Sequence, residues 1–262
     1  MARYKITTIC ISALITIGLA TLCHELGHVI AGRMAGGMPT LITSTEVKGN
    51  FDTLSPAGFV VLGISGSVVN VLFCVLGWWL LRRTSPVAEM QLFAWFFFAV
   101  NGLLVVTAML TEALVGFGDW MTILQGLPAA GVLRALVVLL GLVGTIFMVR
   151  RSGATLGRLI PDGEPQQRTA EARRIVLVGA VASSILMLGS SVLSPVEAAR
   201  AMLLSLGATL GPFIPMIFAT RFVAKIPSEN NSPTTSGGWP WFLAVGLLVI
   251  IIWFIVGPGI LL

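Results

Sequence analysis

The sequence predicts an all-α fold, a polytopic membrane bundle of about six to seven transmembrane helices. Hydrophobic residues make up 56% of the 262-residue chain and charged residues only 10%, whereas a soluble globular domain has about 25% charged residues. Apolar runs of the length that crosses a bilayer, about 20 residues, recur along the whole chain. The net charge of +5 comes mostly from short stretches between these runs, where basic residues orient membrane spans. It therefore does not indicate a nucleic-acid partner.

The first apolar run follows a basic start, as in a signal peptide. Leu22, which precedes Cys23, is too bulky for the usual cleavage site, and the run continues past His28. We therefore expect this segment to stay in the protein as its first span. The candidate spans are Ile6–Ile30, Pro56–Leu81, Gln91–Val115, Ala130–Val149, Ile175–Leu193, Ala198–Thr220 and Trp241–Leu261.

Serine-proline pairs precede three of these spans, and each offers an N-cap serine followed by a proline in the first helical turn. The pairs are Ser55-Pro56, Ser85-Pro86 and Ser194-Pro195.

Two hydrophilic connections differ in kind. The segment from Arg150 to Arg174 holds six arginines and no apolar run, so we expect a solvated loop. Within Met38–Leu54, the stretch Leu41–Val47 favours β-structure and Lys48-Gly49-Asn50 can turn. This pattern predicts a short β-hairpin after the first span, and an irregular loop remains the alternative.

Basic residues alternate between the two sides of a seven-span arrangement. One side carries Arg33, Lys48 and Arg200, and the other holds the larger group, which by the positive-inside rule faces the cytoplasm together with the N-terminus. The larger group comprises Arg3, Lys5, Arg82, Arg83, the six-arginine segment, Arg221 and Lys225.

The sequence His24-Glu25-Leu26-Gly27-His28 contains the only histidines of the chain. On a helix, positions i and i+4 share a face, so both imidazoles can reach one metal ion. Glu25 lies beside them, where it can act on a water molecule held by that ion. Ionisable residues inside an apolar span cost about 2.5–3.5 kcal/mol each, so three in one turn point to a metal site rather than a structural polar cluster.

A zinc site of this type needs a third protein ligand and an open position for water. Asp119 and Glu112 are the acids associated with the third span, and Asn101, Glu112 and Asp119 are spaced by nearly whole helical turns. Asp119 is our first choice for the ligand and Glu112 our second. Gly116 and Gly118 directly precede Asp119, and both glycines loosen the helix there. The alternative for Asp119 is an ordinary interfacial loop acid.

At these residues the chain resembles the site-2 protease family of intramembrane zinc metalloproteases. Gly66-Ser67-Val68-Val69-Asn70 is similar to the family's Gly-Pro-x-x-Asn in the next core span, with serine replacing proline. Gly118-Asp119-Trp120 is similar to the Asp-Gly segment that supplies the family's third ligand, with tryptophan in place of glycine. Pro161-Asp162-Gly163 is closer to the family's Asp-Gly segment in sequence but lies outside any span. The resemblance covers Met1 to Leu127.

The resemblance implies a hydrolase, a zinc-dependent metalloendopeptidase with Zn²⁺ on His24, His28 and Asp119. Glu25 would serve as general base. Asn70 would be a donor to the oxyanion, with Asn101 next in line, although either amide could instead make an interhelical hydrogen bond. The expected division is a catalytic membrane core, 1–127, followed by additional transmembrane helices, 128–262.

The expected substrate is a transmembrane or membrane-anchored protein, and the expected location is the cell membrane. A substrate helix must unwind before hydrolysis, and the Leu41–Leu54 segment could pair with the unwound strand. Two other functions remain open. The chain could be a non-catalytic, zinc-binding membrane chaperone or assembly factor, which the Asp119-Trp120 departure favours, or a transporter, since intramembrane acids and histidines also line ion paths.

Overall fold

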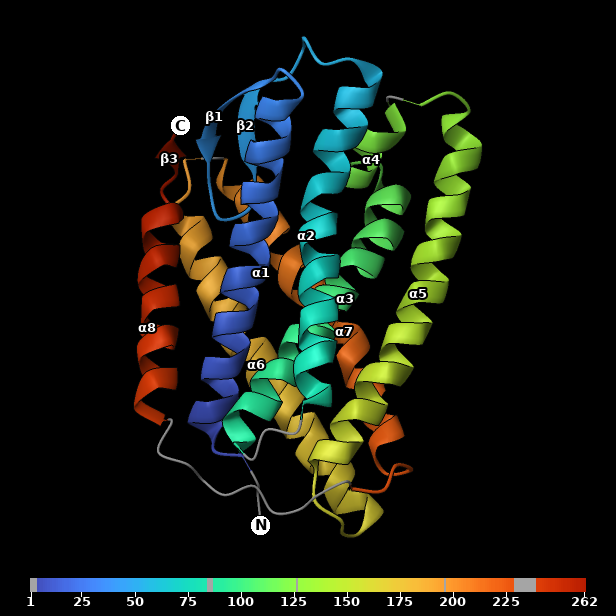
Figure 1. Ribbon diagram of the computed structural model, residues 1–262, viewed down its shortest axis with the longest axis vertical. Helices are drawn as coiled ribbons and strands as arrows, with labels where there is room; N and C mark the ends of the chain where they lie inside the picture. Colours follow the sequence, from blue (N-terminus) through green and yellow to red (C-terminus); the bar gives the residue numbers. More distant parts are fainter. Residues whose placement is uncertain (1–3, 84–86, 126, 196, 229–238) are drawn as a thin grey trace.

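The computed structural model describes residues 4–83, 87–125, 127–195, 197–228 and 239–262, and it shows a helical bundle with one small sheet (Figure 1). The fold class predicted from the sequence is therefore confirmed. The helices are α1 (Ile6–Met34), α2 (Pro56–Arg82), α3 (Ala88–Val115), α4 (Asp119–Gln125), α5 (Ala130–Leu159), α6 (Pro165–Val192), α7 (Ala198–Val223) and α8 (Trp239–Val256); the strands are β1 (Met38–Ile42), β2 (Val47–Asn50) and β3 (Ile260–Leu261).

Six of these helices, α1, α2, α3, α5, α6 and α7, are long and apolar enough to cross a membrane, and α8 is a shorter apolar helix. They fit a multi-pass membrane protein. The chain alternates direction along them, so its N-terminus and C-terminus lie at opposite ends of the bundle (Figure 1). Helix α4 has seven residues and lies beside α2 and α3 at the end that carries the sheet.

Helix α3 forms the centre of the bundle. It packs against α1, α2, α5 and α7, and its aromatic side chains Trp95 and Phe96 are fully buried. The same apolar core includes Met187 of α6 and Trp253 of α8. The segments 1–127 and 128–262 therefore share one core.

The predicted hairpin is present, but its turn lies elsewhere. Strands β1 and β2 pair antiparallel, with Ile42 opposite Val47, so the connection is the segment 43–46. Thr43 closes it, because its hydroxyl oxygen accepts from the backbone N–H of Glu46. The expected turn at Lys48-Gly49-Asn50 is wrong, since these residues belong to β2.

A third strand pairs with the hairpin, and nothing in the sequence suggested it. The residues Ile260 and Leu261 of β3 pair antiparallel with β1, which gives the strand order β2-β1-β3. β1 is therefore paired on both sides. In the described chain, the outer edge of β2 has no strand partner.

The six-arginine segment is not a solvated loop. Helix α5 continues to Leu159 and α6 begins at Pro165, so most of the segment is helical. Arg168 is buried (6% exposed), and its guanidinium donates to the carbonyl oxygens of Ile226, Gly157 and Ile160. Gly157 lies in the last turn of α5, while Ile160 and Ile226 follow the ends of α5 and α7, where carbonyl groups lack partners within a helix.

The predicted cap at Ser55 is confirmed, because its side chain accepts from the N–H of Gly58 and Pro56 opens α2. The prediction for Ser194 is wrong, since α7 begins at Ala198 with Glu197 as its N-cap. The pair Ser85-Pro86 lies outside the described residues.

Candidate metal centre

The two histidines of α1 converge with Asp119 of α4. The Nε2 atoms of His24 and His28 lie 3.0 Å apart. Asp119 Oδ2 lies 2.9 Å from His24 Nε2 and 3.0 Å from His28 Nε2. Three potential ligand atoms, which come from segments more than 90 positions apart in the chain, thus form a nearly equilateral triangle.

Asp119 reaches this position because two glycines break the chain after α3. Gly116 ends α3 with φ at 92°, and Gly118 has φ at 105°, both in the left-handed region that side chains rarely adopt. Asp119 then opens α4. The predicted role of the two glycines is therefore confirmed. The idea that Asp119 shares a helical face with Asn101 and Glu112 is wrong, because α3 ends at Val115, before the aspartate.

Helix α2 packs closely against both α1 and α4, and a glycine lies at each contact. A Cβ atom at Gly66 would lie 2.5 Å from the Cε1 and Nε2 atoms of His24, so only a glycine leaves room for that imidazole ring. At Gly63 a Cβ atom would lie 2.7 Å from Ile123 and 2.8 Å from the carbonyl oxygen of Asp119. The missing side chains let α1 and α4 approach the same face of α2.

The proton on His28 is placed by its neighbours. Its Nδ1 lies 2.8 Å from the carbonyl oxygen of Leu62 and 3.1 Å from Ser65 Oγ. Ser65 Oγ donates to the same carbonyl. A carbonyl oxygen can only accept, so Nδ1 carries the proton and the neutral ring presents the lone pair of Nε2 toward Asp119. Two lone pairs that face each other repel, and a cation between them removes the repulsion.

Asn70 holds His24 from the side opposite the triangle. Its carboxamide nitrogen lies 3.4 Å from His24 Nδ1, while its buried Oδ1 has no partner in the described chain. The two amide atoms have nearly the same shape, so their assignment follows the hydrogen bonds that they can make. With Oδ1 turned to the ring, it accepts from Nδ1–H, and both histidines then offer Nε2 as a ligand atom.

The donor set fits a divalent metal ion. Zinc binds nitrogen and oxygen at about 2.0–2.1 Å in a tetrahedral arrangement, which separates its ligand atoms by about 3.3 Å. The observed separations of 2.9–3.0 Å are close to that value. In the part of the chain that the structure describes, the ion pairs of Asp119 are with the two histidines and not with lysine or arginine. His24, His28 and Asp119 form a group that could hold a metal ion.

Electrostatics keep Asp119 in the form that binds a cation. Burial by itself raises the pKa of this carboxyl, but in the metal-free site the positive charge of a doubly protonated His28 and hydrogen bonds from both imidazoles outweigh burial. The net effect holds the pKa of Asp119 below its usual range, so the side chain stays ionised.

Glu112, the second choice for the ligand, lies behind the site. Its Oε2 accepts the backbone N–H of Trp120, at 3.0 Å, which is one of the unpaired donors at the start of α4. A Cβ atom at Gly118 would collide with the Glu112 carboxyl group. Glu112 therefore holds the segment that presents Asp119.

Glu25 follows His24 on α1, is buried (7% exposed), and interacts electrostatically with both histidines, Asp119 and Glu46. This position is compatible with its predicted role. Asn101 is fully buried, and its amide donates to Phe97 within α3. Asp162 lies in the connection between α5 and α6 and accepts from the N–H of Ser228.

Sequence analysis missed the groups of α2 that hold His28, the Leu62 carbonyl and the Ser65 hydroxyl. A backbone carbonyl has no sequence signal. The spacing of Gly63, Gly66 and Asn70 on one side of α2 is the pattern that could have indicated a face packed against functional groups.

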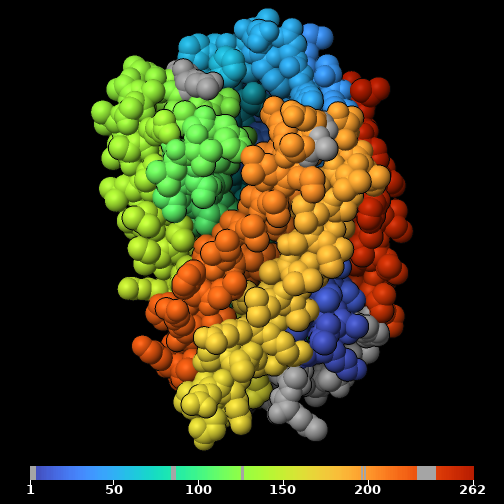
Figure 2. All heavy atoms as spheres, turned by 180° about the vertical axis from the view of Figure 1, so that it is seen from behind, coloured from blue at the N-terminus to red at the C-terminus, as the bar shows by residue number. Residues whose placement is uncertain are grey.

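The metal centre is reachable from outside through its aspartate. The side chain of Asp119 is 32% exposed and that of His24 is 20% exposed, whereas His28 is 8% exposed. Seen from behind, a recess separates α4 from α7 near the end of the bundle that carries the hairpin (Figure 2).

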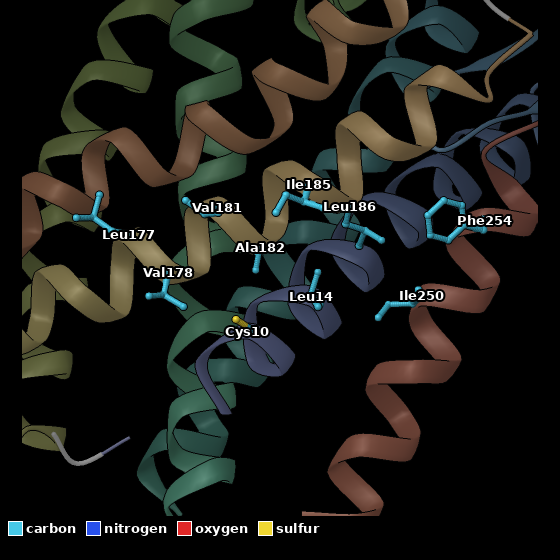
Figure 3. A pocket seen from close by; sticks show the side chains of 10 residues that line it. All are labelled: Cys10, Leu14, Leu177, Val178, Val181, Ala182, Ile185, Leu186, Ile250 and Phe254. Carbon is cyan, nitrogen blue, oxygen red and sulfur yellow. The ribbon is translucent and has the colours of Figure 1, made fainter. Parts of the chain in front are cut away.

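A separate cavity of about 530 Å³ lies between α1, α6 and α8 (Figure 3). It is lined by hydrocarbon side chains and Cys10, and no carboxylate, imidazole or amide lines it. It therefore offers no groups for hydrolytic chemistry.

No protein-family model, curated protein or solved structure matches this chain. The assignment of a function therefore depends on the geometry of the site.

Proposed function

We propose that the chain is an intramembrane zinc metalloprotease of the site-2 protease type, which hydrolyses peptide bonds of membrane-associated proteins. The observation that carries this proposal is the triangle of His24, His28 and Asp119, in which the imidazoles can present unprotonated Nε2 atoms 2.9–3.0 Å from one carboxylate oxygen. Glu25, a buried carboxylate, follows His24 in the sequence and interacts electrostatically with both histidines and Asp119. Two imidazoles and one carboxylate with a remaining open position make a donor set typical of catalytic rather than structural zinc.

Zinc at this site would supply a Lewis acid, which lowers the pKa of a bound water toward about 7 and polarises the scissile carbonyl. Glu25 accepts the proton that the attacking water releases and delivers it to the leaving amide nitrogen as the C–N bond breaks. Both histidines keep a proton on Nδ1 throughout. His24 donates it to Asn70, and His28 donates it to the carbonyl oxygen of Leu62. Asn70 supports catalysis by orienting His24, and its role as an oxyanion donor remains a prediction.

The hairpin supports a peptide substrate in an extended form. The outer edge of β2 (Val47–Asn50) has no strand partner in the described chain, and Lys48, Gly49 and Asn50 are exposed. An unwound substrate segment could add to this edge through backbone hydrogen bonds. Glu46, which directly precedes β2, interacts electrostatically with Glu25.

The distribution of charge orients the site in the bilayer. The C-terminal end of α2, the C-terminal end of α5 and the N-terminal end of α6 are rich in arginine, and they lie at the end opposite the hairpin (Figure 1). By the positive-inside rule the arginine-rich end faces the cytoplasm. The metal centre then lies in the outer half of the membrane, and the cell membrane is the proposed location.

The decisive experiment compares Glu25→Gln with the wild-type chain and a matched control, Glu89→Gln. Glu89 is an acid in the first turn of α3, at the other end of the bundle. Zinc content is measured by mass spectrometry of the purified proteins, and cleavage is followed on single-span reporter proteins in the same liposomes. We expect all three proteins to bind zinc. Cleavage should fall about 100- to 10,000-fold in Glu25→Gln alone, the usual range for loss of a general base.

Two results would contradict the proposal. If the wild-type protein does not bind zinc, the proposed zinc mechanism is wrong. If Glu25→Gln cleaves as well as the wild type, Glu25 is not the general base. A third result, stoichiometric zinc without cleavage of any reporter by wild type, would favour a non-catalytic chaperone. The bulky Trp120 after Asp119 is the feature that favours this alternative. A zinc-free chain that moves ions across liposome membranes would instead be a transporter.

A further inference from the structure

A second cavity lies at the arginine-rich end of the bundle, opposite the candidate metal centre. Its volume is about 260 Å³, and it lies between the C-terminal end of α2 and the last turns of α5, where these helices approach each other in Figure 1. We refer to it as the arginine pocket. Its lining residues are Trp78, Leu81, Arg82, Arg151, Thr155, Arg158 and Leu159.

Two guanidinium groups of the arginine pocket share one indole ring. The Cζ atom of Arg82 lies 4.7 Å from the centroid of the Trp78 ring, and that of Arg151 lies 5.2 Å from the same centroid. Such cation–π contacts hold a guanidinium in place without neutralising it. Across the residues that the structure describes, neither Arg82 nor Arg151 forms a salt bridge with a carboxylate. Two like charges thus lie at one ring, and the described residues supply no carboxylate partner for either.

The surface around the arginine pocket is the part of a membrane protein that meets lipid. On α2, Val75 and Trp79 are exposed, and on α5, Val143 and Phe147 are exposed. These apolar side chains precede the arginines by one or two helical turns. Along both helices the exposed surface therefore changes from apolar side chains to guanidinium groups, as expected at the level of the lipid headgroups. Trp78 marks the same level, because indole rings favour the boundary between acyl chains and water.

We propose that the arginine pocket binds the phosphate of an anionic phospholipid headgroup, with the acyl chains along the exposed faces of α2 and α5. Phosphate oxygens accept from guanidinium groups with matched geometry, so one phosphodiester can neutralise Arg82 and Arg151 together. Basic pockets between transmembrane helices are known to suit anionic headgroups. The bound lipid would join the ends of α2 and α5, two helices that both pack against α3.

The test is lipid binding by the intact, delipidated protein. Native mass spectrometry counts bound phosphatidylglycerol in the presence of phosphatidylcholine with the same acyl chains. The double variant Arg82→Gln/Arg151→Gln is compared with a matched control, Arg83→Gln. Arg83 also stacks on an indole, at 3.9 Å from the Trp79 ring, but it is not among the residues that line the pocket.

We expect the wild type and Arg83→Gln to bind phosphatidylglycerol in preference to phosphatidylcholine, with affinities within about twofold of each other. The double variant should bind it about 100-fold more weakly, because each hydrogen bond between a guanidinium and the phosphate contributes about tenfold, and Arg83 lies outside the pocket and makes no such contact. If the double variant does not purify as a monodisperse protein, the two single variants replace it, each with an expected loss of about tenfold.

Two outcomes overturn the proposal. Equal losses in the double variant and in Arg83→Gln would show a diffuse basic surface without a defined site. Inorganic phosphate at millimolar concentration is the second arm. If the wild type binds inorganic phosphate but does not prefer phosphatidylglycerol to phosphatidylcholine, the pocket takes free phosphate and the lipid assignment is wrong.

Discussion

Replacing Gly66 by alanine is the sharpest test of the candidate metal centre, because the change lies on α2 and removes no ligand. A Cβ atom there would lie 2.5 Å from Cε1 and Nε2 of His24 and 2.6 Å from Cδ2. Ordinary van der Waals contact begins near 3.4 Å. The imidazole must therefore move by about 0.9 Å, or α1 and α2 must separate.

Either response removes His24 from the metal position. Protein metal sites keep ligand distances within about 0.2 Å, so a displacement of about 0.9 Å, the difference between the 3.4 Å and 2.5 Å contacts, exceeds the tolerance several-fold. Changes that only reorient a ligand already lower metal affinity by about 10- to 100-fold. We expect Gly66→Ala to weaken zinc binding at least 100-fold, which corresponds to about 2.7 kcal/mol.

The matched control is Gly207→Ala on α7, where a Cβ atom meets nothing within 4 Å. Zinc affinity is measured for both variants by competition with a chromogenic chelator, and thermal stability is measured in the same detergent. Overpacking alone costs about 1–3 kcal/mol of stability, so the melting temperatures separate a general loss of packing from a specific loss of metal. A zinc affinity for Gly66→Ala within threefold of the control would refute the geometry.

Three further experiments test individual groups. Asp119→Asn should bring the zinc content of the purified protein close to zero, whereas Glu112→Gln should keep it, because an amide oxygen can still accept the N–H at the start of α4. Equal zinc in both variants would contradict the assignment of the third ligand. Asn70→Ala should lower zinc affinity about 10- to 100-fold without abolishing binding, the usual effect of losing a partner that orients a histidine, and chelator competition measures it. Arg168→Met should lower the melting temperature far more than Arg173→Met, since Arg168 is buried on three carbonyl groups and Arg173 is exposed; each hydrogen bond to a charged group contributes about 1.5–3 kcal/mol. Similar melting temperatures would show that the three carbonyl groups find other partners.

The membrane bundle and the two histidines of the candidate metal centre could be predicted from the sequence. Apolar runs long enough to cross a bilayer form helices, because backbone N–H and C=O groups in hydrocarbon must make hydrogen bonds within their own segment. The pair His24 and His28 depends on the pitch of one helix. These features involve interactions between residues close in sequence, so the sequence alone is sufficient for them.

Two predictions failed because contacts outside the segment itself decide its structure. The six-arginine segment was expected to be a loop because it is charged. It is helical because α5 and α6 extend beyond the apolar zone, where Arg168 finds carbonyl partners as far away as Ile226. The turn of the hairpin was placed at Gly49, yet that glycine packs against the backbone of Met38 and Pro39 in the paired strand.

Composition and a 3.6-residue period are local properties, and they indicate the lipid solvent, the helical spans and the two imidazoles on one helical face. The choice between Asp119 and Glu112 needed the folded bundle, because it depends on two glycines of positive φ and on the close approach of α4 to Gly63. The folded bundle also assigned the histidine protons through Leu62 and Asn70. Those contacts join separate helices, and their geometry is set by packing across the whole bundle.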